Sequence, residues 1–415
     1  MLTEEINKLI CEVGPGTPGG EFMRRYWHPV SMSSEVTAGG QPKQVRILGE
    51  DLVLFRDDQG RPGLLGVHCS HRLVSLAYGR PEDGGLRCPM HGWLYDIGGH
   101  CLDQPAEPDE TFKDRIRHLA YPCQDMGGLI FAYMGPEEKM PLLPRYEALV
   151  REDGNRQVTW WPIEGNYLQH LEGAWDNIHA GFLHTMHWSE KKKELPSLPK
   201  PKVELMETEF GLIRRSDQWH PGATFGRAYG YFYMPTGWQR LQSNWIPNQF
   251  RLDRANPQDD IQKFQSWFVP VDDGHTLRYQ VAFAPLNADG TPFKWRGDGQ
   301  LMQPTREQDY GRDFAHIDSI SGIDPSTAET FRAQDTMANE TQGYPYMDRS
   351  REHLGAHDHI QTAMRMMILK GISDVQNGVD PKHILRDSEQ NDVFYIRGAD
   401  ALEQFTNERE VAGAR

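Results

Sequence analysis

Short runs of β-forming residues, separated by turn residues, fill the chain between Gln44 and Tyr133. Val45–Leu48 and Leu52–Phe55 are two such runs, and the polar turn Asp57–Gly60 follows the second. This spacing is typical of an all-β module. Three prolines then fall within Pro136–Pro144. Because each proline fixes φ and removes a hydrogen-bond donor, this segment is expected to be an extended connector.

The residues after the connector mix helix and strand patterns. Tyr229, Tyr231 and Tyr233 recur with a period of two, which favours a strand. Trp267–Val271 and Leu277–Val281 flank Asp272-Asp273-Gly274 as a hairpin would. Helices are expected in three segments, 167–183, 328–339 and 360–369. The acidic residues after Asp392 are expected to form a loosely held tail. The prediction is an α+β protein with two domains, residues 1–145 and 146–415.

Composition narrows the class of protein. Hydrophobic residues make up 38% of the chain and charged residues 25%, which permits a large packed core. The net charge of −15 disfavours a nucleic acid or an anionic membrane as the main partner. Five cysteines are too few, and odd in number, for a disulfide framework. With no signal-like start and no run approaching the roughly 18 apolar residues of a membrane span, the expected location is cytoplasmic.

Two short segments carry ligand spacing for a metal. Cys69-Ser70-His71 precedes Cys88-Pro89-Met90-His91, so that each segment offers one thiolate and one imidazole. A structural zinc site also accepts two Cys and two His, but zinc fingers usually place Cys with Cys and His with His. The mixed pairs suit a two-iron cluster in which the thiolates bind one iron and the imidazoles bind the other. Cys88–Trp93 resembles the Rieske [2Fe-2S] module of ring-hydroxylating oxygenases.

A second constellation, Asp176-x2-His179-x4-His184, lies in the expected helix 167–183 and just beyond it. On an ideal helix His179 and His184 point about 140° apart, so both reach one metal only if the helix distorts or ends near Gly181. Two histidines and a carboxylate form the facial triad of non-haem Fe(II) oxygenases. Taken alone, the segment also fits polar residues on a solvated helix. Beside the Rieske signature it resembles the Rieske non-haem iron oxygenases, which implies that His179 and His184 bind iron and that Asp176 joins His179 to His91 of a neighbouring subunit.

The third iron ligand is expected far along the chain. Gln334–Thr341 resembles the late helix of the family, in which a ligand Asp is followed five positions later by Glu, and the resemblance therefore favours Asp335. The other acidic candidates are Glu340, Asp348 and Asp358.

Further segments place the resemblance within the phthalate dioxygenase type. These segments are Val13–Gly20, Arg24–Pro29 and Asp348–Gly355. The resemblance implies a catalytic domain with an antiparallel sheet flanked by helices (a helix-grip, START-like fold), and assembly as a homotrimer or stacked trimers. Many members of this type act on carboxylated aromatic compounds, so the resemblance also implies a substrate of that class. A carboxylate favours an arginine fork in the pocket, and four arginines of the sheet region are candidates: Arg214, Arg215, Arg227 and Arg240.

The predicted function is a terminal oxygenase that uses O2 to hydroxylate, dihydroxylate or O-demethylate a small aromatic compound. The implied cofactors are a [2Fe-2S] Rieske cluster and a mononuclear Fe(II). The chain carries no G-x-G-x-x-G between a strand and a helix, so the electrons are expected from a separate reductase. Two alternatives are a Rieske electron-transfer protein without oxygenase activity and a structural protein with two zinc ions.

Overall fold

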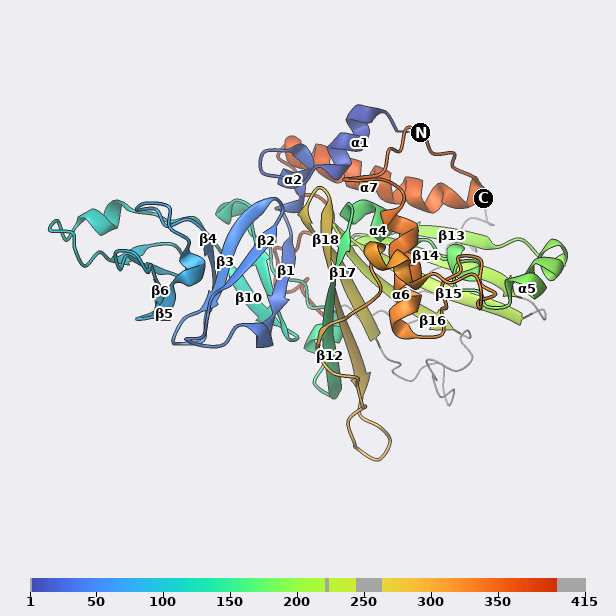
Figure 1. The fold of residues 1–415 in the computed structure, drawn as a ribbon. Coiled ribbons are helices and arrows are strands. Elements are labelled where there is room, and N and C mark those ends of the chain that lie inside the picture. Colours follow the sequence, from blue (N-terminus) through green and yellow to red (C-terminus); the bar gives the residue numbers. More distant parts are fainter. Residues whose placement is uncertain (1, 221–223, 244–262, 394–415) are drawn as a thin grey trace.

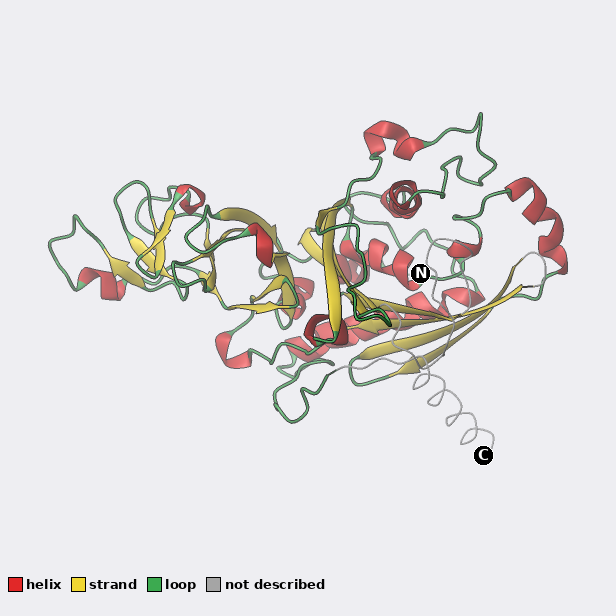
Figure 2. Ribbon diagram, turned by 90° about the horizontal axis from the view of Figure 1, so that it is seen from below, coloured by secondary structure: helices red, strands yellow, loops and turns green. Residues whose placement is uncertain are grey.

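A computed structural model of the chain describes residues 2–220, 224–243 and 263–393. Several small sheets lie at one end of the molecule, and one large sheet with most of the helices lies at the other (Figures 1 and 2). The expected α+β class is confirmed by this arrangement.

The first end of the molecule is the expected β-rich module. Its sheets have the orders β1-β11-β10, β2-β3-β4-β9 and β5-β6-β7-β8. The predicted strands at Val45–Leu48 and Leu52–Phe55 are confirmed as β2 and β3. The strands of this module are β1 (Trp27–Met32), β2 (Lys43–Ile47), β3 (Glu50–Arg56), β4 (Pro62–Gly66), β5 (Arg80–Glu82), β6 (Gly85–Arg87), β7 (Leu94–Asp96), β8 (Cys101–Asp103), β9 (Ala120–Tyr121), β10 (Cys123–Met126) and β11 (Leu129–Tyr133).

The large sheet has the order β13-β14-β15-β16-β17-β18-β12-β19. Its strand pairs are antiparallel except for β12 with β19, so the sheet is mixed at one edge. The predicted hairpin is confirmed, because Trp267 of β17 pairs with Tyr279 of β18. The strands of this sheet are β12 (Gly154–Glu164), β13 (Lys202–Glu207), β14 (Gly211–His220), β15 (Thr224–Tyr233), β16 (Gly237–Ser243), β17 (Lys263–Asp272), β18 (His275–Pro285) and β19 (Gly299–Gln300).

The described α-helices confirm two of the three predicted helical segments and shorten the other. Helices α6 and α7 cover the segments expected at 328–339 and 360–369, whereas the helix expected over 167–183 ends at Trp175. No described helix has the length and apolar character that crossing a membrane requires. The described helices are α1 (Glu4–Cys11), α2 (Pro18–Met23), α3 (Glu147–Val150), α4 (Tyr167–Trp175), α5 (Trp188–Glu194), α6 (Ala328–Glu340) and α7 (His359–Gln376).

The N-terminal helices lie with the C-terminal ones. Both α1 and α2 contact α7, and one hydrophobic core joins residues of these helices with both β1 and the large sheet. A second core belongs to the β-rich module alone and contains Cys69 and Cys88. The division of the chain at residue 145 stays a prediction. The tail expected after Asp392 lies almost entirely outside the described residues.

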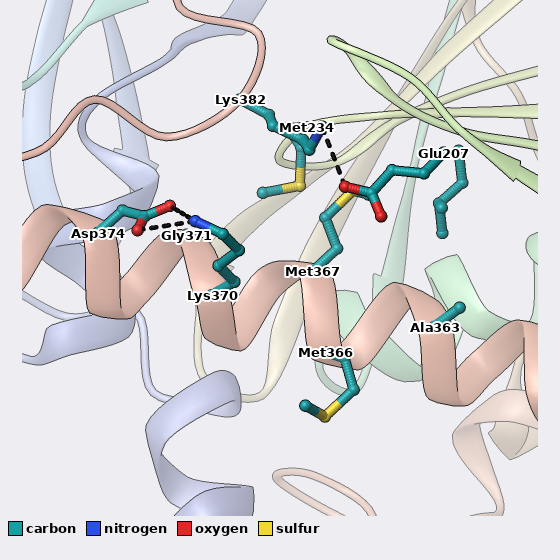
Figure 3. A pocket seen from close by; sticks show the side chains of 10 residues that line it. Glu207, Met234, Ala363, Met366, Met367, Lys370, Gly371, Asp374 and Lys382 are labelled. Atoms are coloured by element: carbon teal, nitrogen blue, oxygen red, sulfur yellow. Dashed lines mark hydrogen bonds and ion pairs between the residues drawn. The ribbon is translucent and has the colours of Figure 1, made fainter.

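A cavity of about 460 Å³ lies between α7 and the large sheet. Figure 3 shows the ion pairs of Lys370 with Asp374 and of Lys382 with Glu207 beside it. Met234 and Met367 contribute apolar surface. None of the predicted metal ligands lines this cavity.

Candidate metal centres

Asp176 ends helix α4 and starts the turn that follows it. Its backbone is extended (φ −68°, ψ 135°), so the helical hydrogen-bond pattern stops there. Its carboxylate then accepts hydrogen bonds from the backbone N–H groups of Ile178 (2.8 Å) and His179 (3.3 Å). Asp side chains favour such local turns over a continued helix. The helix therefore ends before both histidines, earlier than the break expected near Gly181, and a single 3-10 turn (His179–Gly181) carries the first of them.

Helix α6 brings Asp335 to these histidines. Oδ1 of Asp335 lies 3.0 Å from Nε2 of His184 and 3.4 Å from Nε2 of His179. One ligand atom from each of the three residues lies within 4.8 Å of the others. Helix α6 packs closely on α4 at Gly173, where a Cβ atom would lie 2.3 Å from Oδ1 of Asn339. The structure thus gathers three predicted ligands that are up to 156 residues apart in the printed sequence.

Each histidine presents Nε2 to Asp335 and has a partner for Nδ1. Nδ1 of His179 lies 3.4 Å from Oδ2 of Asp176, and Nδ1 of His184 lies 2.7 Å from Oε1 of Gln334. The Nε2 group of Gln334 donates hydrogen bonds to Oγ of Ser321 (3.1 Å) and to the carbonyl of Ile323 (2.8 Å), so its Oε1 must face His184. Hydrogen bonds of this kind fix the tautomer of a metal-binding imidazole and leave Nε2 free to bind.

The ring of His184 is held on a further side. Phe331, one turn before Asp335 on α6, stacks on it with a centroid distance of 3.8 Å and an interplanar angle of 15°. The side chain of His184 is 5% exposed, whereas those of His179 and Asp335 are 27% and 35% exposed. The cluster is therefore rigid on the His184 side and accessible on the other.

Neighbouring groups shift the pKa values of His179, Asp335 and Asp176. Burial alone would lower the pKa of His179, but hydrogen bonds to Asp176 and Asp335 outweigh it and raise the pKa to about 9. Burial also opposes ionisation of Asp335, yet His184 and His179 hold its pKa well below the ordinary value. Asp176 has a lowered pKa because its hydrogen bond to His179 outweighs burial. The site thus concentrates carboxylate charge where a cation would be stabilised.

The donor set fits an Fe(II) ion. Two imidazole nitrogens and one carboxylate oxygen are the ligands of the non-haem iron triad, which leaves other coordination positions open. The acidic alternatives to Asp335 are committed elsewhere. Glu340 accepts from the backbone of Glu164 (3.0 Å) and from the Tyr310 hydroxyl (2.8 Å), and Asp348 and Asp358 accept from Ser350 and Gly355.

The four predicted cluster ligands lie on two loops of the β-rich module. One loop follows β4 and the other joins β6 to β7. Cys69 and Cys88 are buried, while the His71 and His91 rings lie nearer the surface with centroids 4.6 Å apart. Nδ1 of His91 is buried and has no hydrogen-bond partner among the described residues. Two thiolates on the buried side and two imidazoles on the outer side fit a Rieske cluster.

Two aromatic side chains contact the cluster ligands. The Tyr95 hydroxyl lies 3.2 Å from Sγ of Cys69. The Trp93 ring stacks on His71 with a centroid distance of 4.5 Å and an interplanar angle of 6°. Both residues follow directly after the second ligand segment in the sequence, and that position is the signal that points to them.

The four arginines predicted to contact substrate do not form one group. Arg214 is buried with its guanidinium carbon 5.3 Å from the Trp175 ring. Arg215, the next residue, faces the other side of the sheet and pairs with Glu204 at 2.6 Å. The side chains of Arg227 and Arg240 lie outside the described part of the chain. For all four arginines, contact with substrate stays a prediction.

Sequence reasoning assigned no role to Gln334, Phe331 or Arg278. Gln334 and Phe331 could have been noticed only because they are close to Asp335 on one helix. Arg278 had a stronger signal, since it is a lone cation in the aromatic and apolar strand Leu277–Val281.

Known proteins share both parts of this architecture. A model of the Rieske [2Fe-2S] domain matches residues 26–120. The oxygenase subunit of 5,5'-dehydrodivanillate O-demethylase from Sphingobium sp. (strain NBRC 103272 / SYK-6) is 33% identical over 404 residues, which are 94% of this chain and 85% of that protein. The oxygenase subunit of phthalate 4,5-dioxygenase from Pseudomonas putida is 32% identical over 406 residues, which are 91% of this chain and 88% of that protein.

A solved structure shares the fold. It is the reduced complex between oxygenase and ferredoxin in carbazole 1,9a-dioxygenase, with a TM-score of 0.58 and 18% identity over 92% of this chain and 99% of that one. The match to the Rieske domain and the sequence relationships over nearly the whole chain lead to one conclusion. The chain belongs to the Rieske non-haem iron oxygenases and is an oxygenase subunit of that family.

Proposed function

We propose that the protein oxidises an aromatic carboxylate with O2, using electrons from a separate reductase or ferredoxin. The observation that carries this proposal is the cluster of His179, His184 and Asp335, whose ligand atoms lie within 4.8 Å of one another on one side of a partly exposed site. The names of the two similar relatives, dehydrodivanillate O-demethylase and phthalate 4,5-dioxygenase, support an aromatic carboxylate as the substrate class. The ferredoxin bound in the carbazole dioxygenase structure supports a separate electron donor.

When bound, the [2Fe-2S] cluster supplies single electrons and the mononuclear iron supplies the reaction site for O2. The chain's own residues hold and orient these groups. Asp176 and Gln334 accept the Nδ1 protons of His179 and His184, so that both Nε2 atoms point to Asp335. Phe331 covers the His184 ring and excludes water from that side. The reaction is therefore confined to the open side of the cluster, where the substrate ring must bind.

A homotrimer would complete the electron path. The β-rich module with the two ligand loops lies at one end of the molecule, and helices α4 and α6 lie with the large sheet (Figure 1). This separation supports electron transfer between two chains rather than within one. His71 and His91 form the outer side of the cluster site, as a contact with a neighbouring chain requires. In this arrangement Asp176, which hydrogen-bonds the His179 turn, is also the residue that receives His91 of the neighbour.

The test is a single-turnover reaction of the anaerobic, chemically reduced holoenzyme. Phthalate and benzoate are added with isotopically labelled O2, and the products are analysed by mass spectrometry. The expected result is label in the organic product for at least one acid, or release of an O-alkyl group from a methoxylated acid such as vanillate. A His184→Ala variant that keeps its Rieske absorption should give no product. Electron loss to O2 with no organic product from any of the three acids would contradict the proposal.

A further inference from the structure

Arg278 occupies an unusual place on the large sheet. It aligns with Trp161 on one neighbouring strand and with Phe268 on the other, so the three side chains lie side by side on one sheet face. The guanidinium carbon lies 4.8 Å from the Trp161 ring, 5.3 Å from the Trp238 ring and 4.7 Å from the Phe268 ring. Three aromatic rings therefore surround this cation.

This face of the sheet is the one that α4 and α6 cover. Regular strand pairing from β14 to β18 places Arg214 and Arg278 on the same face, and Arg214 contacts Trp175 of α4. The charge of Asp335 on α6 also acts on Arg278 and favours its charged form. Arg278 thus lies on the sheet face that is covered by α6, the helix that carries Asp335.

Arg278 has no anionic partner within the described part of the chain. No ion pair or hydrogen bond involves its side chain there, and its Nε group is buried without an acceptor. Burial lowers the pKa of Arg278 to about 10, so it remains a cation at neutral pH. Burying a charge without a hydrogen-bonded partner is costly. Because the side chain is only partly buried, its other N–H groups can still reach a ligand.

A second arginine approaches the same tryptophan from α6. Arg332 lies one turn before Asp335, and its guanidinium carbon is 5.9 Å from the Trp161 ring. One of its nitrogens donates to the carbonyl of Met302 (2.9 Å), while its Nε is buried without an acceptor among the described residues. The two arginines repel each other, and Asp335 is already engaged by two histidines.

The pair of arginines contrasts with the net negative charge of the chain. In a chain with a net charge of −15, two cations with unused donors flank Trp161 beside a metal-ligand cluster. An acid bound here would accept hydrogen bonds from the free donors of Arg278 and would also be attracted by the charge of Arg332. A planar carboxylate matches the fork of a guanidinium group, and an attached aromatic ring matches the aromatic surroundings.

We propose that Arg278, assisted by Arg332, binds the carboxylate of the aromatic substrate and thereby orients its ring towards the iron site. This assignment rests on the proposed oxidation of an aromatic carboxylate, and it names residues for substrate binding other than the four predicted from the sequence. The cost of an unpaired buried cation in the free enzyme is recovered when the acid binds.

The test is calorimetric binding of acids and their neutral esters to the anaerobic holoenzyme. The probes are phthalate and benzoate, with dimethyl phthalate and methyl benzoate as the uncharged counterparts. The variants are Arg278→Met, Arg278→Lys and Arg332→Met, each checked for folding by circular dichroism and for Rieske absorption. The control is Arg312→Met, which removes an arginine that is half exposed and pairs with Asp309 at 2.7 Å.

Arg278→Met and Arg332→Met are expected to weaken acid binding by about 10- to 100-fold, as loss of charged hydrogen bonds predicts. Ester binding should change by less than about threefold, within the range of a small packing change. Arg278→Lys should restore part of the acid affinity, and Arg312→Met should bind like the wild type. Even if Arg278→Met fails to fold, Arg332→Met still tests the site.

Three results would overturn the proposal: unchanged acid binding in the folded arginine variants, equal losses for acid and ester, or a wild type that binds no acid. The labelled-O2 reaction separates this outcome from failure of the proposed function. Acids that are oxidised equally well by wild type and variants, with equal KM, refute the Arg278 site alone. Acids that bind through Arg278 but gain no oxygen and lose no O-alkyl group refute the oxidation alone.

Discussion

Nδ1 of His184 lies 2.7 Å from Oε1 of Gln334, the residue directly before the proposed ligand Asp335. The amide of Gln334 is held by Ser321 and Ile323, so this contact fixes the direction in which the imidazole presents Nε2. We expect Gln334→Met to weaken Fe(II) binding at the mononuclear site by about 10- to 100-fold, because partners of this kind typically contribute that much. Competition with a chromophoric Fe(II) chelator under anaerobic conditions measures the affinity.

Gln303→Met is the matched control for this change. Gln303 also hydrogen-bonds α6, through Oγ1 of Thr336 at 2.8 Å, but within the described residues it has no hydrogen bond to any of the three ligands. Its variant should keep the wild-type iron affinity. Equal iron affinity in the Gln334 and Gln303 variants would show that Gln334 does not orient His184.

The Tyr95 hydroxyl is expected to raise the potential of the Rieske cluster. A thiolate bound to iron has no hydrogen to donate, so Tyr95 must donate to Sγ of Cys69 across their 3.2 Å contact. Removing a hydrogen bond to a ligand sulfur disfavours the reduced cluster. Tyr95→Phe should lower the midpoint potential by about 20–60 mV, which corresponds to one hydrogen bond for a one-electron couple. Tyr78→Phe, at a side chain that is 82% exposed, should leave the potential unchanged in the same titration.

Asp176→Asn tests the proposed electron path. Asparagine keeps the size of the side chain but removes the charge that favours a protonated His179 Nδ1. We expect the variant to retain both iron centres and to lose at least about tenfold of the rate of substrate-dependent cluster oxidation, as removal of a ligand's carboxylate partner typically costs. Stopped-flow absorption of the reduced protein measures this rate. Asp374→Asn on α7, which breaks an exposed ion pair with Lys370, is the control. Wild-type rates in Asp176→Asn would rule out the path.

His28 makes the stability of the fold depend on pH. It is fully buried on β1, with Nε2 2.8 Å from the carbonyl of Met23, and burial lowers its pKa to about 4. Between pH 6.5 and 4 the unfolded chain binds a proton that the folded chain does not bind, so the free energy of unfolding falls as the pH falls through this window. Above pH 6.5 the residue is neutral in both states and has no such effect.

Replacement by a neutral donor should remove this contribution. His28→Gln can still donate to Met23 but cannot titrate. From pH 7 to pH 5 the wild type should lose about 2 kcal/mol more stability than the variant, measured by urea unfolding at each pH. Equal losses in the two proteins would show that His28 is protonated in the folded state.

The features that the sequence could predict are formed by residues close together in the chain. The ligand loops Cys69–His71 and Cys88–His91 each lie within a few residues, so their spacing alone indicates a metal site. The hairpin across Asp273 follows from alternation and turn residues, and the spacing of the two histidines indicated that one continuous helix could not present both to a single metal. The expected helix nevertheless extended too far, because the turn formed by the Asp176 carboxylate overrides the helical pattern around it.

Other parts depend on contacts between distant segments. The motif that resembles the family's late helix pointed to Asp335, but only the packing of α6 against α4 brings it to the histidines. The role of Arg278 follows from the register of β12, β17 and β18 and from the approach of Arg332 on another element. Sequence patterns do not encode such a register across more than one hundred residues, so the sequence pointed to other arginines as partners of a carboxylate.

We propose that one chain holds both a Rieske cluster and a mononuclear iron bound by His179, His184 and Asp335. Quantitation of iron and acid-labile sulfide in the anaerobic protein, beside an Asp335→Ala variant, tests for both centres. We predict about three irons and two sulfides per wild-type chain, and about two irons and two sulfides in the variant. Equal iron content in the two proteins after Fe(II) reconstitution, or zinc with no sulfide, would contradict the account.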